Sequence, residues 1–245
     1  MSGLRLVQIF AVALLVLLVG LAPLQLGLKM KSVERQGLGA RAVSGTIWRG
    51  ELQGARLGGV GLGDVRLGLH VPGLLLGGGR VWFDAQGPIS ARGVAVMTGA
   101  EFGVRDFDAS LPLEGIMSRA PVRGRLRLDG VTAAFRNGAC SAATGRVTID
   151  RISLPGAAQL APSLALSGVP ACKGGLLVTP LSGQVEGIAF DLLMTIDASG
   201  GYRLETLLRA ANPSFGALTA LAGFERTMRG FLRVDRGRLG IDASA

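Results

Sequence analysis

From Val43 onward, apolar residues recur at every second position, and this pattern limits what the chain can fold into. The clearest case is VRGRLRLDG, in which Leu126 and Leu128 alternate with Arg125 and Arg127. The same alternation occurs in VRLGLHV (65–71), RVWFDAQ (80–86), RVTI (146–149), SLALSG (163–168), VEGIAFDLLMTI (185–196) and GYRLETLL (201–208). Alternation gives a strand one apolar and one polar face, which is typical of antiparallel meanders. The sequence therefore predicts a mainly β fold.

Glycine and proline divide these segments, and short motifs recur among them. The protein has 39 glycines and 10 prolines in 245 residues, and connections such as PGLLLGGG carry the residues that turns require. The glycine runs 58–63 and 77–79 are therefore interpreted as turns and bulges. The tetrapeptides LDGV (128–131), LSGV (166–169) and LSGQ (181–184) resemble one another without a fixed spacing. This loose recurrence favours one continuous curved sheet or half-barrel over residues 43–245, rather than two packed domains.

One short helix is predicted near the C-terminus, from Pro213 to Thr227. Asn212 suits the N-cap and Pro213 the first helical position. Apolar residues at 215, 218 and 221 form a stripe that would cover an open end of the sheet.

The run Leu6–Leu28 contains 23 residues without a charge, flanked by Arg5 and Lys29. About 20 apolar residues suffice for a helix to cross a bilayer, so residues 1–31 are predicted to be a transmembrane anchor and 32–42 a polar stalk. The alternative is a cleaved signal peptide, but its apolar region is shorter and ends in a small-x-small site. The flanking charges do not settle the orientation, because long domains cross the membrane largely regardless of charge.

The formal charge of +9 would ordinarily suggest an acidic partner. Of the 26 basic residues, however, 23 are arginines scattered through strand-like segments, with no basic stripe interleaved with aromatic residues. Nucleic-acid binding is therefore not expected.

The sequence contains no recognisable catalytic or metal-binding motif. His70 is the only histidine and falls on the polar face of its segment, where a solvated surface role is expected. Neither a phosphate-binding loop nor a G-x-S-x-G nucleophile motif occurs. We therefore expect a protein that is not an enzyme and has no catalytic residue, no metal site and no cofactor.

The two cysteines, Cys140 and Cys172, carry information about the compartment. They are 32 residues apart and each lies beside a turn, with no C-x-x-C motif. In an oxidising compartment they would form a disulfide, which contributes about 3–4 kcal/mol in the chain-entropy model. The alternative is two independent buried thiols in a cytosolic domain. A glycine-rich β domain with an even number of cysteines favours the disulfide, and with it the periplasmic side.

Several segments together resemble the type II secretion system protein N family. They are the N-terminal anchor, GTIWRG (45–50), ELQGARL (51–57), LLLGGGRVWFD (74–84), LRLDGV (126–131), FRNGAC (135–140), SGVPACKGG (167–175) and GYRLETLLRA (201–210). In the first of these motifs we single out Gly45, Thr46, Trp48 and Gly50. By itself this element predicts a core tryptophan in the first strand, with small neighbours that allow close backbone approach; a partner-docking tryptophan is the alternative.

The resemblance implies a single-pass protein of the bacterial inner membrane with its β domain in the periplasm. It also implies an accessory or assembly role in exporting folded proteins across the outer membrane, through contacts with other secretion subunits. The family is in turn similar to AsmA-like proteins, whose sheets enclose an apolar groove that can hold lipid. A lipid-binding or lipid-transfer module is therefore the alternative function. The oligomeric state is not predicted.

Overall fold

The computed structural model describes residues 38–57, 60–70, 78–112, 123–153, 164–185, 187–210 and 223–238. These ranges form sixteen strands and contain no helix. Accordingly, no helix with the length and apolarity needed to span a bilayer occurs within them. The predicted anchor 1–31, and residues 213–222 of the predicted C-terminal helix, lie outside the described residues.

The strands follow one another at short intervals. In chain order they are β1 (Leu38–Gly39), β2 (Ala42–Gly45), β3 (Gly50–Leu57), β4 (Val60–Leu69), β5 (Gly78–Gln86), β6 (Ser90–Thr98), β7 (Glu101–Pro112), β8 (Arg123–Arg136), β9 (Ala139–Ser153), β10 (Leu166–Gly168), β11 (Ala171–Lys173), β12 (Leu176–Val185), β13 (Ile188–Ile196), β14 (Gly201–Ala210), β15 (Glu225–Thr227) and β16 (Gly230–Arg238).

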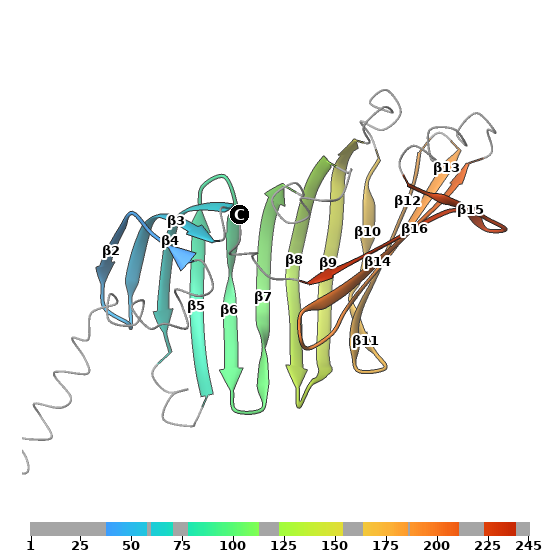
Figure 1. Cartoon of the computed structure of the whole chain (residues 1–245). Coiled ribbons are helices and arrows are strands. Elements are labelled where there is room, and N and C mark those ends of the chain that lie inside the picture. Colours follow the sequence, from blue (N-terminus) through green and yellow to red (C-terminus); the bar gives the residue numbers. More distant parts are fainter. Residues whose placement is uncertain are drawn as a thin grey trace, which may run out of the picture.

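All sixteen strands belong to one antiparallel sheet, in which most pair with their neighbours in the chain. Figure 1 shows them side by side from β2 to the crossing strands β12–β16. β1 and β2 both pair with β3, while β10 and β11 both pair with β12, so each of these pairs is one interrupted strand. The prediction of a single, mostly antiparallel sheet is confirmed.

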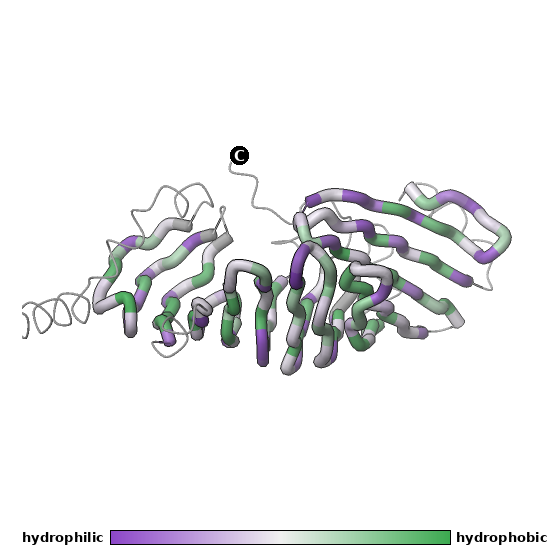
Figure 2. The backbone as a smooth tube through the Cα atoms, turned by 90° about the horizontal axis from the view of Figure 1, so that it is seen from below, coloured by the Kyte–Doolittle hydropathy of each residue, from purple (hydrophilic) through white to green (hydrophobic). Residues whose placement is uncertain are grey.

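The sheet is curved and does not close. Viewed from below, it bends so that the strands at its two ends rise on the same side (Figure 2). Its pairing order begins at β1 and ends at β15, and these strands do not pair with each other. The molecule is therefore an open, bent sheet rather than a barrel.

Most buried apolar residues share one face of the sheet, which we call the inner face; the opposite face is the outer face, where Val96 and Ala134 are also buried. On β12, Leu177, Thr179 and Leu181 are buried, whereas Pro180 and Ser182, at alternate positions, are exposed. The larger core cluster joins β8–β14 and consists of Val131, Val147, Ile149, Leu164, Leu166, Leu181, Ile188, Phe190 and Leu208. A smaller one joins β3–β5 and consists of Leu52, Ala55, Val65 and Ala85. The predicted alternation thus defines the core.

The two LSG motifs pair with each other. Ser167 lies opposite Ser182, which places each leucine across from the other motif's glycine. A Cβ on Gly168 would lie 1.7 Å from the carbonyl oxygen of Pro180, and a Cβ on Gly183 would lie 2.2 Å from that of Ala165. These glycines are needed because the neighbouring backbone occupies the space of a side chain.

Three segments differ from the sequence-based predictions. Glu225–Thr227, the end of the predicted helix, forms strand β15, because these residues pair with Gly230–Leu232 of β16. The sheet begins at Leu38, within the range predicted as stalk, since Leu38 and Gly39 pair with β3. Gly78 and Gly79, interpreted as turn residues, begin β5 and pair with Thr98 and Met97.

Candidate functional site

The GTIWRG motif forms the tight connection between β2 and β3. Gly45 and Gly50 pair at its base, the Thr46 N–H donates to the Arg49 carbonyl at 3.0 Å, and the Arg49 N–H donates to the Thr46 carbonyl at 3.2 Å. Gly45 adopts a φ of +85°, and a Cβ there would lie 2.4 Å from the Arg49 oxygen. The motif is therefore a hairpin turn that requires its first glycine.

Trp48 lies in this turn, partly buried, and not within a strand. The neighbouring Ile47 carbonyl accepts a hydrogen bond of 3.1 Å from the Leu69 N–H, which fixes the turn to β4. The carbonyl oxygen of Trp48 lies so close to Gly68 that a Cβ there would approach it to 2.1 Å. The close backbone approach expected at this tryptophan thus occurs at Gly68 of β4.

The turn borders a hollow of about 300 Å³ on the outer face. Its lining comes from the four neighbouring strands β2–β5 and the turn, and consists of Ser44, Gly45, Arg49, Gly50, Glu51, Arg66 and Trp82. Arg66 lies opposite Glu51 on one side and Asp84 on the other in the strand register. Two guanidinium groups, an indole and one carboxylate therefore share a small concave surface.

Cys140 and Cys172 form a disulfide, with their Cα atoms 5.4 Å apart. Cys140 stands near the start of β9 and Cys172 in the short strand β11. A hydrogen bond of 2.8 Å from the Cys140 N–H to the Gly175 carbonyl joins the same two segments. The disulfide therefore ties the β11–β12 hairpin to the middle of the sheet.

His70 is exposed at the end of β4, where its N–H donates to the Arg80 carbonyl at 2.9 Å. Among the residues that the structure describes, no group of three or more histidine, cysteine, aspartate or glutamate side chains could hold a metal ion.

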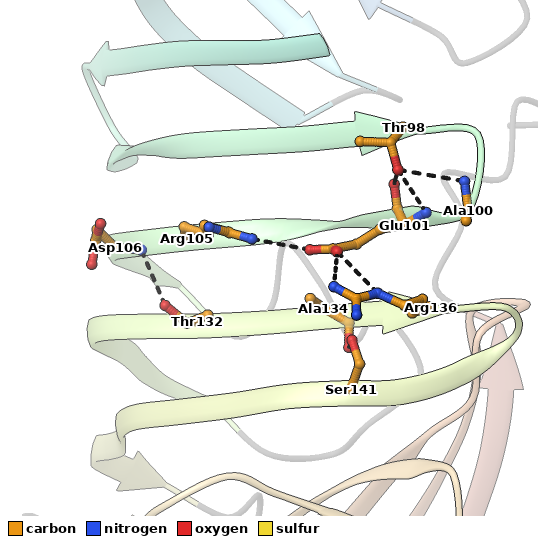
Figure 3. Close-up of polar contacts among 9 residues, drawn as sticks. All are labelled: Thr98, Ala100, Glu101, Arg105, Asp106, Thr132, Ala134, Arg136 and Ser141. Carbon is orange, nitrogen blue, oxygen red and sulfur yellow. Dashed lines mark hydrogen bonds and ion pairs between the residues drawn. The ribbon is translucent and has the colours of Figure 1, made fainter. Parts of the chain in front are cut away.

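Glu101 is the centre of a polar cluster on the outer face (Figure 3). Its carboxylate accepts hydrogen bonds from Arg136 Nη2 at 2.6 Å and from Arg105 Nη2 at 3.1 Å, and its side chain is only 11% exposed. The Thr98 hydroxyl accepts the Glu101 N–H at 2.9 Å and so closes the β6–β7 turn. These bonds, first those from Arg136 and then those from Arg105, lower the pKa of Glu101 below its ordinary value.

Two aspartates bind the backbone of bulged strands next to their own. Asp108 on β7 accepts the Gly130 N–H at 2.7 Å, and Asp64 on β4 accepts the Gly54 N–H at 2.9 Å. Both glycines have positive φ, +56° and +59°, where the strand register shifts. The Gly130 bond, followed by that from Arg92, lowers the pKa of Asp108. Sequence reasoning missed these two hydrogen bonds from backbone to carboxylate, although an L-x-G sequence occurs at both bulges.

A larger groove of about 690 Å³ lies on the outer face of β12–β16. Its apolar lining includes Pro180, Leu193, Leu207 and Leu232, and the β15–β16 hairpin contributes Met228, which is fully exposed. Arg209 forms an ion pair with Asp191, and Arg203 forms one with Glu205. These residues lie on β13 and β14, two of the strands that form the groove. This groove is an apolar surface with a charged border, next to the strand that ends the sheet.

No curated protein and no solved structure matches the chain. The family model described as type II secretion system (T2SS), protein N matches residues 36–234. This match covers most of the chain, from just before β1 into β16. The chain therefore belongs to the type II secretion system protein N family.

Proposed function

We propose that this chain is an inner-membrane accessory subunit that assists assembly of the type II secretion system. In this proposal Leu6–Leu28 anchor the protein, the sheet lies in the periplasm, and the protein acts through contacts with other secretion subunits and not through catalysis. The observation that carries the proposal is the family match over residues 36–234. The 23-residue apolar run that precedes the sheet supports the anchor.

The last strands of the sheet suit such contacts. Along β16, the pairing with β15 ends at Leu232, and within the described residues the segment 234–238 pairs as a strand only with β14. Unpaired strand edges accept an added strand from a partner. Beside this edge, Leu193 of the apolar groove is 36% exposed, and Val234 on the edge strand itself is 39% exposed. Edge and groove together form the surface that we assign to another secretion subunit.

A deletion strain tests the role in secretion. We expect export of type II substrates to fall when the gene is deleted and to recover with the intact chain, but not with a chain lacking Leu6–Leu28. Unchanged export in the deletion strain would contradict the proposal.

Single substitutions test the surface. Leu193→Glu places a charge in the groove and should reduce export while the protein level is maintained. Val169→Glu is the matched control, because Val169 is 53% exposed and does not line the groove. Equal export by the two variants would exclude the groove from partner binding.

The alternative function is a lipid-binding module, and one observation favours it. On the inner face, Met97 and Phe102 are 71% and 43% exposed and pair directly with each other, and Phe102 stacks on Phe135 with ring centroids 5.3 Å apart. Lipid acyl chains would suit such a surface. Mass spectrometry of lipid extracted from the purified protein distinguishes the two functions: stoichiometric lipid favours this alternative, and its absence dismisses it.

A further inference from the structure

The GTIWRG turn and the hollow beside it are not used by the proposed function. We propose that this hollow binds the anionic headgroups of the membrane in which the chain is anchored, and so holds the first strands of the sheet against the bilayer surface. The inference rests on the anchor in the proposed function.

The arginines of the hollow are available for an anion. The seven ion pairs of the described residues involve arginines from Arg92 onward, and none joins Arg49 or Arg66 to a carboxylate. Guanidinium groups bind phosphate through paired N–H donors. Glu51 also lines the hollow, but the two guanidinium groups leave it with a positive balance.

The surrounding strands carry the same balance. In the described residues of β1–β5 and their connections there are five arginines (41, 49, 56, 66 and 80) and three carboxylates (51, 64 and 84). One of these carboxylates, that of Asp64, accepts the Gly54 N–H. The outer face near the N-terminus therefore attracts anions, at a strength that salt should reduce.

The hollow also lies where a membrane surface is within reach. Leu38 follows Leu28 by ten residues, and ten residues span at most about 35 Å. β1 pairs with the Leu57 end of β3, and β2 pairs with the other end, which carries Gly50 and Glu51 of the hollow. This end lies about 20 Å along the strand from Leu57, a distance shorter than the reach of the connection. Trp82 adds an indole, the side chain enriched where membrane meets water. Because the anchor is connected to the first strands by this short segment, the headgroup layer is an anionic surface that the hollow can reach.

The two tryptophans provide a direct test. Trp48 and Trp82 are the only tryptophans of the protein, and both belong to this turn and hollow, so intrinsic fluorescence reports on this region alone. The full-length chain is reconstituted into vesicles of phosphatidylcholine, with or without phosphatidylglycerol, each containing a lipid whose headgroup bears a nitroxide quencher. We expect stronger quenching in the phosphatidylglycerol vesicles and a loss of this difference at high salt.

Paired variants identify the residues. R49Q/R66Q should weaken the phosphatidylglycerol-dependent quenching by about fivefold for each arginine, the effect of one cation at an anionic membrane surface. R49K/R66K should keep most of it. R203Q/R209Q removes the same charge from β14, at the other end of the sheet, and should leave the quenching unchanged. An intact Cys140–Cys172 disulfide and an unchanged circular dichroism spectrum verify the fold of each variant.

Three outcomes would overturn the inference: equal quenching in both kinds of vesicle, equal loss in R49Q/R66Q and R203Q/R209Q, or abolition of the difference by inorganic phosphate at constant ionic strength. The last would assign the hollow to a soluble phosphate. Failure of the full-length chain to remain in vesicles after alkaline extraction would instead contradict the anchor, and with it the proposed function.

Discussion

Single glycines decide how closely the middle strands approach. Gly183 lies against Ala165 and Leu166, and a Cβ there would lie 2.2 Å from a backbone oxygen that cannot move without shifting its strand. We expect Gly183→Ala to destabilise the protein by about 1–3 kcal/mol, the usual effect of overpacking. Gly99→Ala is the control, because a Cβ there meets nothing within 4 Å. Urea unfolding followed by circular dichroism measures both, and equal midpoints would contradict the prediction.

The stability of the sheet depends on pH in part through Glu101. The pKa of Glu101 is lowered in the folded state by Arg136 and Arg105, so below the ordinary glutamate pKa of about 4.3 the unfolded chain binds more protons. The stabilisation is therefore complete above this pH and is lost as the pH falls toward the lowered value. Glu101→Gln should flatten this acid decline. Denaturation midpoints between neutral and acid pH measure it, and parallel profiles for the two proteins would refute the assignment.

The sequence predicts which face of the sheet a side chain occupies more readily than it predicts these contacts. The faces of Leu166, Phe190 and Val147 follow from alternation alone, because the side-chain period of a strand is two. The pairing of Gly183 with Leu166 and the bonds from Arg136 to Glu101 depend on register. Register is set by turns and bulges that a single sequence does not reveal.

At the scale of strands, two bulges are held by carboxylates from neighbouring strands. Removing one carboxylate should loosen its own bulge and leave the other intact. We expect Asp108→Ala to accelerate hydrogen exchange of the Gly130 amide, which loses its acceptor at 2.7 Å, whereas Asp64→Ala should accelerate only that of Gly54. Each variant serves as the control for the other in exchange monitored by NMR. Faster exchange at both glycines in both variants would indicate general destabilisation instead.

The limits of strand prediction are visible at β15. Residues 213–227 combine an N-cap, a proline and an apolar stripe, which locally favour a helix. Glu225–Thr227 nevertheless pair with β16, because a neighbouring strand with free backbone groups overrides local preference. The hollow and the groove could not be predicted either, since each collects residues from several strands whose register a single sequence does not reveal.

At the scale of the whole molecule, one bent sheet has two ends with different surfaces. Toward the N-terminus lies the hollow with Arg49, Arg66 and Trp82; toward the C-terminus lie the apolar groove and the edge of β16. The sequence predicted a single curved sheet and the compartment-dependent disulfide. It did not predict this division, because scattered arginines and leucines acquire a location only through strand order. Membrane attachment at one end would leave the other available to a partner.

The disulfide provides a test of the compartment in which the sheet lies. If the sheet lies in the periplasm, Cys140 and Cys172 should resist alkylation in intact cells until a reductant is added, and a reporter fused to the C-terminus should be active only outside the cytoplasm. C140S/C172S should lower the free energy of unfolding by about 3–4 kcal/mol, because the unfolded chain loses a constraint over 32 residues. Gel-shift labelling measures the first result and urea unfolding the second. Free thiols in untreated cells would place the sheet in a reducing compartment, where neither the bond nor the proposed contacts would form.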